Sequence, residues 1–522
     1  MLSVSVNTAV VRVGSGSADR SGSIAAEGES VKRPESAIEA QWRAENTVID
    51  VLVVFGYLCA MLAVGWRSRN QSADRYWVAN RQSGTRRVTA SLVATIFGAS
   101  STFGIIGLGY TRGLTAAWWS LVGAAALTLF GFTLAARVRE LGVYTLPDIL
   151  KRAYGNIVAV PASAIIVVAW CAVIAAQMIA GAWILNGVLD LSYTASLTLV
   201  AAVFVLYTFW GGQMSVLKTD SWQLVLFGVG LVACVLLVSV AAKSHLGSLG
   251  DIARRGHLSF PVSDDFGWYD LLVYYPLIVG LPYLVGPDIY SRILCATDIS
   301  VARRSALTGA MIIIPISFML AALGVMLRGL YPGLAQEAAL PTAIRDLVPV
   351  GFTGLIAAGF LAAIMSSADT TLVSAATILS LNIVGARSKI PQAHQLISTR
   401  VAVIGLGLVA WLIAGLQQGI IPSLLLAYTI FVGGVVFPTL GSFYQGSLRI
   451  TSAGAMWAVI VGGTAAILGE IRDGVLMTAA LGTHGVAIML KLLGPHYLSL
   501  LPILLSATVM FTVSWTAGRA RA

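Results

Sequence analysis

The sequence predicts an all-α protein that crosses a membrane many times, and three observations support this fold class. Hydrophobic residues make up 57% of the 522 residues, charged residues only 11%, and the mean hydropathy is +0.85. The apolar residues form continuous runs of about 20 residues, the length that an α-helix needs to cross a bilayer. A membrane β-barrel would instead show alternating strands of about 10 residues. Since lipid satisfies no backbone hydrogen bond, these runs predict helices.

Thirteen of the runs are predicted to be membrane-spanning helices, which makes residues 48–522 a single transmembrane domain. A further run at 474–493 is apolar enough to span, yet it contains His484 and several glycines. We interpret it as a fourteenth helix, a re-entrant segment or a surface segment. The thirteen helices are predicted, in chain order, at 48–66, 88–110, 116–137, 155–186, 192–210, 219–241, 268–290, 304–328, 350–384, 399–417, 420–443, 453–469 and 497–517.

Residues 1–47 differ from the rest of the chain. They are rich in Ser, Gly, Glu and Ala and show no apolar periodicity. Such a segment buries too little apolar surface to fold alone, so we expect a disordered N-terminal tail. The tail has no basic start followed by an apolar core, and it is therefore not predicted to be a signal peptide.

Basic residues are distributed unequally between the connectors. With thirteen helices, the connectors on one side contain twenty Lys and Arg residues and those on the other side seven. Because cytoplasmic loops are enriched in Lys and Arg, we expect a multi-pass protein of the inner (cell) membrane with its N-terminus outside and its C-terminus cytoplasmic. The net charge of +10 comes from these scattered residues. We therefore expect no nucleic-acid partner.

Two predicted helices contain clusters of helix-breaking residues. The helix at 88–110 includes ATIFGASSTFGIIGLGY. The helix at 268–290 contains most of the segment YYPLIVGLPYLVGPDIYSR, which runs on to residue 292. Inside a helix glycine costs about 1 kcal/mol and proline about 3 kcal/mol, so both segments predict unwound backbone. They lie five helices apart, and because five is odd the second unit would cross the membrane upside down, as an inverted repeat requires. The alternative is that these residues serve only close packing and kinks.

Five segments carry a family resemblance. They are DRYWVANRQSG at 74–84, TLPDILKRAYG at 145–155, FWGGQMSVLKTDSWQ at 209–223, DIYSRILCATDISVARR at 288–304 and LAAIMSSADTTLVSAATILSLNIV at 361–384. In this order, over about residues 48–469, they resemble the sodium:solute symporter family, which includes bacterial proline, pantothenate and sugar carriers. The resemblance implies two inverted five-helix repeats, at about 88–241 and 268–443, flanked by extra helices. It also implies sodium-coupled symport of a small organic solute by alternating access, with Na+ as the coupling ion.

The resemblance further implies a sodium site between the unwound part of the first core helix and the eighth core helix. Carried over by position, its ligands are the carbonyls of Ala94, Phe97 and Ala363 and the hydroxyls of Ser366 and Ser367. Oxygen is the ligand type that suits hard cations. The alternative for the two serines is a hydrogen bond back to a carbonyl one turn earlier in their own helix.

Two acids are candidates for a second cation site or for gating. Asp369 is the lone acid in the apolar part of its helix and is followed by Thr370, at two positions where some relatives of the family use hydroxyl residues. Intramembrane acids are functional candidates because burying them is costly. A sodium ligand, a proton acceptor and a structural partner for an arginine all remain open for Asp369. Asp220 matches an acid near the inner gate of the family, and a capping or solvated aspartate is the alternative.

The candidates for solute binding are polar residues beside the two breaks or in the fourth helix. Any of them has an alternative role as a bridge between helices. Ile96 and Pro282 depart from residues that many relatives or the sugar carriers have, which disfavours a sugar as substrate. The candidates are Ser100, Ser101, Thr102, Gln177 and Tyr283.

Sodium-coupled symport is not the one function that this sequence allows. A proton-coupled symporter and a solute sensor with the same fold are alternatives, although the chain ends a few residues after its last predicted helix without a soluble domain. No HExxH, GxSxG or paired intramembrane acids occur in the sequence, so we expect no enzyme and no catalytic residues. The expected partners are the solute and the bilayer, with no obligatory protein partner. Neither metal-ligand spacing nor a pairing pattern links the four cysteines, Cys59, Cys171, Cys234 and Cys295.

Overall fold

The computed structural model describes residues 37–243, 250, 256–349, 351–386, 391–417, 419–470 and 475–519. Within these ranges the chain is helical, with isolated β-bridges and no strand. Its contacts define two units, residues 1–45 and 46–522. Only the start of α1 (Ala37–Arg67) is described in the first unit, and residues 1–36 of the predicted tail lie outside the described residues. Residues 37–47 are helical, because Ala, Glu, Gln and Arg are strong helix formers.

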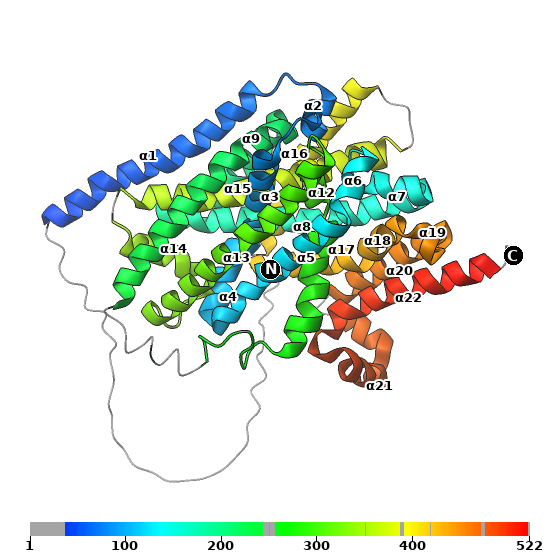
Figure 1. Ribbon diagram of the computed structural model, residues 1–522. Coiled ribbons are helices and arrows are strands. Elements are labelled where there is room, and N and C mark those ends of the chain that lie inside the picture. Colours follow the sequence, from blue (N-terminus) through cyan, green and yellow to red (C-terminus); the bar gives the residue numbers. More distant parts are fainter. Residues whose placement is uncertain are drawn as a thin grey trace, which may run out of the picture. The chain divides into compact units, whose positions relative to one another are not determined.

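The first half of the bundle corresponds to the predicted repeat at 88–241 (Figure 1). Its first helix is broken, as the glycine cluster predicts. The break separates α3 from a π-helical turn and α4, and further helices follow it. In chain order the elements are α3 (Thr85–Ile96), η2 (Ser100–Gly104), α4 (Ile105–Arg112), α5 (Trp118–Thr133), α6 (Ala135–Leu141), α8 (Asn156–Leu189) and α9 (Tyr193–Lys243).

Two pairs of predicted helices run together, and so the predicted count of thirteen is not confirmed. The stretch Ser100–Thr133 covers parts of the helices predicted at 88–110 and 116–137, and α9 covers those predicted at 192–210 and 219–241. Among the described residues, eleven helical stretches are long and apolar enough to cross a membrane, and α9 counts as one of them. Its 51 residues would extend about 75 Å as a regular helix, more than twice the thickness of a bilayer core. Gly212 interrupts it with φ +58°, between the two helices predicted at 192–210 and 219–241.

The second half of the bundle contains the other broken helix. Two π-helical turns lead into it, and Gly286 separates its last two pieces. The elements are η4 (Asp270–Tyr274), η5 (Pro276–Gly280), α11 (Leu281–Val285), α12 (Pro287–Ile293), α13 (Ile299–Leu330), α15 (Thr353–Ile378), η6 (Leu379–Val384), α16 (Gln392–Leu416), α17 (Ile420–Phe431), η7 (Val432–Val436) and α18 (Phe437–Phe443).

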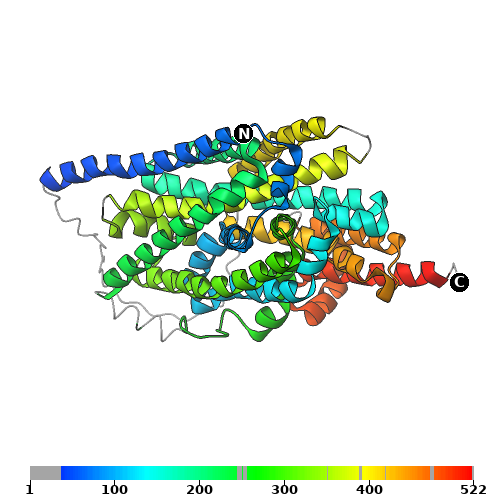
Figure 2. The same ribbon diagram turned by 45° about the horizontal axis from the view of Figure 1, so that its top comes forward.

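The remaining elements connect or flank this core. The helices α20, α21 and α22, drawn in orange to red, pack together beside the bundle (Figure 2). The uncertain run at 474–493 forms α21, which Gly482 interrupts with φ +66°. The elements are α2 (Ala73–Val78), η1 (Ala79–Arg81), η3 (Gly113–Ala117), α7 (Leu146–Tyr154), α14 (Gln336–Leu347), α19 (Gln445–Leu448), α20 (Ser452–Glu470), α21 (Val475–Leu493), η8 (Gly494–His496) and α22 (Tyr497–Arg519).

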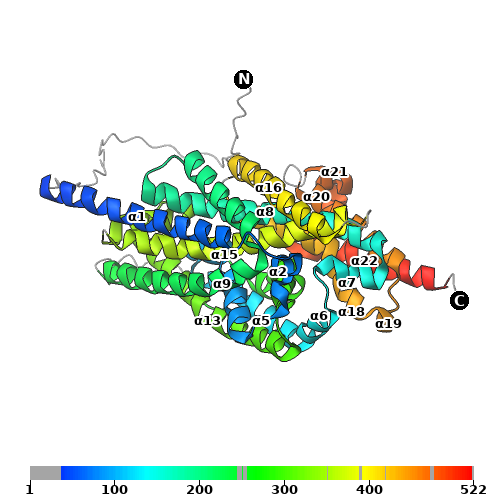
Figure 3. The ribbon, with the colours of Figure 1, turned by 90° about the horizontal axis from the view of Figure 1, so that it is seen from above.

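The centre of the bundle is α15. It is buried along nearly its whole length, whereas only 28% of an apolar 18-residue stretch is buried in α9 and in α16. Figure 3 shows it running through the middle of the helices, where it packs against α8 and α9. Because α15 carries Ser366, Ser367, Asp369 and Thr370, these polar groups face neighbouring helices rather than lipid.

Glycines bring α4 and α13 into backbone contact. A Cβ atom at Gly109 would lie 2.5 Å from the carbonyl oxygen of Ala321. A Cβ at Gly324 would lie 2.8 Å from the backbone nitrogen of Tyr110. Side chains larger than hydrogen would separate the two helices, so these glycines permit the close packing that is common in membrane bundles.

The connectors have local caps that the sequence encodes. In TLPDIL, the Thr145 hydroxyl and the Asp148 carboxylate form a capping box at the start of α7. Asp298 caps α13, and hydrogen bonds from the Val301 N–H and the Thr297 hydroxyl lower the pKa of its carboxyl group. The apolar runs do not predict α14, because its 12 residues include polar and charged ones and are too few to span.

Candidate functional site

The first break exposes the end of α3 to α15. The helix stops at Ile96, and the N–H of its cap residue Phe97 bonds to the Val93 carbonyl. The last carbonyls of a helix have no partner within it. One of them, that of Ala94, lies 3.0 Å from the Ser366 hydroxyl, which is also 2.8 Å from the Ala363 carbonyl. Three oxygens from two helices therefore converge at this point.

Gly98 allows α15 and α8 to approach the break. A Cβ atom there would meet the Ser367 side chain and would lie 2.6 Å from Oε1 of Gln177. The same Oε1 accepts a hydrogen bond of 2.7 Å from the Ala99 N–H. The amide of Gln177 thus takes the place of the helical bond that the break removes.

The structure brings the predicted sodium ligands to one place without deciding their role. Ala94, Ala363 and Ser366 are in direct contact, Ser367 lies against Gly98, and Phe97 caps the same end of α3. The contact of Ser366 with Ala363 is a bond back to its own helix, as the alternative predicts. The ligand assignment stays a prediction.

A buried charged cluster lies beside these oxygens. Arg292 of α12 is fully buried and pairs with the buried Asp220 of α9 at 3.5 Å. Arg292 also donates to the Thr370 hydroxyl, and Ser91 donates to Asp220. Arg292 lies between the helices predicted at 268–290 and 304–328 and is one of the twenty basic connector residues. Its complete burial corrects that interpretation. The signal for its role is its place inside DIYSR, directly after the second break.

Asp369 belongs to the same region but has a different environment. Its Oδ1 accepts a bond of 2.9 Å from the Thr208 hydroxyl, while its Oδ2 has no hydrogen-bond partner among the described residues. The ion pair of Arg292 goes to Asp220 and not to Asp369. Thr370, the neighbour of Asp369, lies 3.2 Å from the Thr95 hydroxyl.

A cavity beside the first break collects three of the five predicted solute-binding residues. Ser100, Gln177 and Tyr283 line it. Ser101 lies behind them, with its hydroxyl 3.4 Å from that of Tyr283, and Thr102 donates to the Gly98 carbonyl at 2.7 Å. The same carbonyl also accepts the Thr102 N–H, so the hydroxyl of Thr102 bonds back to the preceding turn, which is a structural role.

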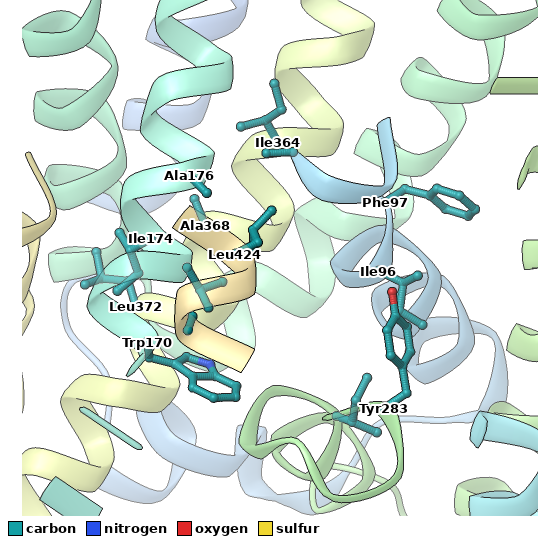
Figure 4. Packing of buried hydrophobic residues seen from close by; sticks show 14 of the residues in the cluster. Ile96, Phe97, Trp170, Ile174, Ala176, Tyr283, Ile364, Ala368, Leu372 and Leu424 are labelled. Atoms are coloured by element: carbon teal, nitrogen blue, oxygen red, sulfur yellow. The ribbon is translucent and has the colours of Figure 1, made fainter. Parts of the chain in front are cut away.

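Three large or charged residues of the cavity wall are not among the sequence predictions: Trp170 of α8, Asp288 of α12 and Tyr428 of α17. Figure 4 shows Trp170 on α8 and the predicted Tyr283 on α11. The position of Asp288 directly after the Gly286–Pro287 break could have predicted that it lines the site. The sequence contains no such signal for Trp170 and Tyr428, because aromatic residues in apolar helices usually serve packing.

Sequence comparison relates the chain to known transporters. The sequence profile of the sodium:solute symporter family matches residues 76–462. Solute carrier family 5 member 4A of Mus musculus is 23% identical, over 82% of this chain and 73% of the relative. Sodium/myo-inositol cotransporter 2 of Rattus norvegicus is 25% identical, over 92% of this chain and 79% of the relative.

Structural comparison gives the same fold. A substrate-bound, outward-open Na+-coupled sialic acid symporter aligns with a TM-score of 0.74 at 19% identity, covering 89% of this chain and 97% of the other. A nucleobase-cation-symport-1 family transporter aligns with a TM-score of 0.55 at 13% identity, covering 84% and 95%. With the profile match over most of its length, the chain belongs to the sodium:solute symporter family and is a multi-pass, sodium-coupled secondary transporter rather than an enzyme.

Proposed function

We propose that this transporter moves a small organic solute together with sodium, and that the sodium ion binds between α3 and α15. Its ligands are the carbonyls of Ala94, Phe97 and Ala363 and the hydroxyls of Ser366 and Ser367. The observation that carries the proposal is the convergence of the Ser366 hydroxyl with the Ala94 and Ala363 carbonyls. One sodium ion moving down a potential of 100 mV supplies about 2.3 kcal/mol for solute accumulation.

The position of these oxygens links ion binding to conformational change. Ala94 and Phe97 belong to the first repeat, whereas Ala363, Ser366 and Ser367 belong to the second. An ion bound by both repeats favours the arrangement in which they lie together, and its release allows them to separate. Differential binding of this kind shifts the balance between outward-open and inward-open states.

The solute occupies the cavity next to this ion site. Ser100, Gln177 and Tyr283 contact it, and Ser101 acts through its contact with Tyr283. Since Ser367 lines the cavity and also lies against Gly98, a change at the ion site reaches the solute directly. Thr102 is the weakest of the candidates because its hydroxyl is bonded to the Gly98 carbonyl.

A second cation or proton binds near Asp369, Thr370 and Asp220. The cluster contains two carboxylates and one guanidinium, so its side chains carry one negative charge in excess when all are ionised. The unpartnered oxygens, Asp369 Oδ2 and Asp220 Oδ1, are free to accept a proton or to bind a cation. This feature favours proton coupling as a second candidate function.

The transporter lies in the inner (cell) membrane with its N-terminus outside and its C-terminus cytoplasmic. The unequal distribution of basic connector residues supports this orientation, and removing the buried Arg292 from the larger group leaves the bias intact. The break at Gly482 divides α21 into pieces that are about 10 Å and 16 Å long, too short to cross about 30 Å of hydrocarbon. A fluorescent protein fused after Ala522 should be active, and a phosphatase at the same point inactive. The reverse pattern contradicts this orientation.

The decisive test of the ion site is sodium binding to the Ser366→Ala/Ser367→Ala double variant. Removing both hydroxyls leaves three carbonyls, too few for a dehydrated ion, so binding of radioactive sodium to the purified protein should be lost. Ser317→Ala is the matched control, because Ser317 is a buried serine of α13 that bonds back to Ile313 at 2.7 Å. Equal sodium affinity in the double variant and in the wild type would refute the assignment.

A further inference from the structure

The solute cavity contains an acid that forms no salt bridge among the described residues. Of the described residues that line the cavity, Asp288 is the one carboxylate, and no lysine, arginine or histidine lies among them. Arg292, one turn further along α12, lies within electrostatic range of Asp288, but its salt bridge is with Asp220. Backbone N–H groups of Asp288 and Ile289 bond to the carboxylate. They occupy part of its acceptor capacity of about four lone-pair sites.

Two tyrosines line the same cavity as this acid. Both Tyr283 and Tyr428 lie within electrostatic range of the Asp288 carboxylate. Aromatic rings attract cations through their negative faces, most strongly where water is excluded. A cavity lined by a carboxylate and two tyrosines suits a positively charged group.

The wall on α8 has the opposite character. Trp170 and Gln177 are seven residues apart, so they lie on the same face of α8. Trp170 is buried, and its indole N–H has no hydrogen-bond partner among the described residues. Gln177 uses its oxygen for the Ala99 N–H, which leaves its NH₂ group for a ligand. This wall therefore offers hydrogen-bond donors, whereas α12 offers a negative charge.

We infer that the cavity binds a small solute that carries an ammonium group and an oxygen acceptor. The ammonium group, from primary to quaternary, lies at Asp288 between the two tyrosines, and the oxygen accepts bonds from Trp170 and Gln177. This inference rests on the proposed function, in which the cavity is the solute site. A neutral polyol would leave Asp288 without a counterion of its own inside the membrane, which is costly, and a simple anion would be repelled by it.

The test uses pairs of probes that differ in charge and not in shape. Choline is paired with 3,3-dimethylbutan-1-ol, glycine betaine with 3,3-dimethylbutanoate, and L-proline with cyclopentanecarboxylate. Thermal stabilisation of the purified protein is measured in saturating sodium, with myo-inositol and glucose as neutral polyols. We expect at least one ammonium probe to stabilise the protein and its uncharged-carbon partner to have no effect. A wild-type protein that no ammonium probe stabilises overturns the inference.

Variants of the cavity residues test whether the ammonium probe binds at Asp288. Asp288→Asn should weaken binding of the active ammonium probe by about 30-fold or more, the loss typical of a buried charge pair without one partner. Asp265→Asn is the control, since Asp265 is an exposed acid outside the cavity. If Asp288→Asn does not fold, Trp170→Phe keeps an aromatic ring but removes the indole N–H donor and should weaken binding of the same probe by about fivefold. Unchanged affinity in the folded variants overturns the inference.

Sodium binding separates this inference from the proposed function. It is measured in the same preparations with radioactive sodium and without solute. Intact sodium binding with stabilisation by a polyol alone refutes the ammonium class and leaves the proposed function in place. Absent sodium binding in the wild type refutes the proposed function itself.

Discussion

The two broken helices occupy equivalent places in the two repeats, yet their chemistry differs. The break between α3 and η2 presents neutral oxygens, namely the Ala94 carbonyl and the hydroxyl of Ser366 that reaches it. The break between α11 and α12 is followed by formal charges, Asp288 and Arg292. Neutral oxygens suffice for an ion that brings its own charge, whereas buried charges need partners. The first break is thus suited to an inorganic cation, and the second to charged side chains and solutes.

The strongest test of this contrast is the ion pair after the second break. Arg292→Met should lower the free energy of unfolding by about 3–5 kcal/mol, because it leaves the Asp220 charge buried without its partner. Adding Asp220→Asn should restore much of the loss. Denaturant titration in mixed micelles measures both variants. Equal stability of Arg292→Met and wild type would show that this charge pair does not stabilise the contact between the two repeats.

Gly98→Ala tests the neutral break. The added methyl group has no room between Ser367 and Gln177, so it should cost about 1–3 kcal/mol through overpacking and should weaken sodium binding. Gly228→Ala is the control, because no atom lies within 4 Å of a Cβ there, and alanine at that helical position should be neutral or stabilising by up to about 1 kcal/mol. Equal stability and equal sodium binding of the two variants would show that the break does not require α15 and α8 to approach Gly98 closely.

Asp369→Asn tests an acid that lies near the Arg292–Asp220 ion pair but forms no ion pair itself. Asparagine keeps the oxygen that accepts from Thr208, so the stability should change by less than about 1 kcal/mol. The dependence of solute uptake on sodium concentration and pH should nevertheless change. Proteoliposome uptake across both variables measures it. Overlapping profiles for variant and wild type would reduce Asp369 to a structural residue.

Thr102→Val has the smallest expected effect. The hydroxyl bonds to the Gly98 carbonyl and does not line the cavity, so its loss should cost about 1 kcal/mol and leave solute affinity within about threefold of wild type. Ser100→Ala, at a residue that lines the cavity, is the contrasting variant and should weaken solute binding more. A tenfold loss of affinity in Thr102→Val would place Thr102 in the solute site.

Most of the fold follows from the sequence, because bilayer thickness fixes the length of each apolar run and Gly and Pro mark the breaks. The bounds of α8 agree with the predicted 155–186 to within three residues, and α15 together with η6 ends at residue 384 as predicted. The start of α13 lies five residues before the predicted residue 304. The helix α14 escaped prediction because it is short and partly polar. The connector between the helices predicted at 192–210 and 219–241 is itself part of α9, apart from the interruption at Gly212.

The site was less accessible to prediction. Only the family resemblance related Ala94 to Ser366, since their contact depends on tertiary packing between repeats. Arg292 was misread because a basic residue at the end of an apolar run is usually a connector residue, and its partner Asp220 lies in a different repeat. Trp170 was missed because its role depends on an unpartnered N–H, which only a packed structure reveals.

The glycine contact between α4 and α13 bears on where the first broken helix bends. Because the two backbones pack directly against each other, we expect α4 and α13 to move together although they belong to different repeats. Residues 97–99, between α3 and η2, are then the expected hinge at which α3 changes its angle. A spin-label pair on α3 and α4 would report the transport cycle as a change of angle, while a pair on α4 and α13 would keep a constant distance.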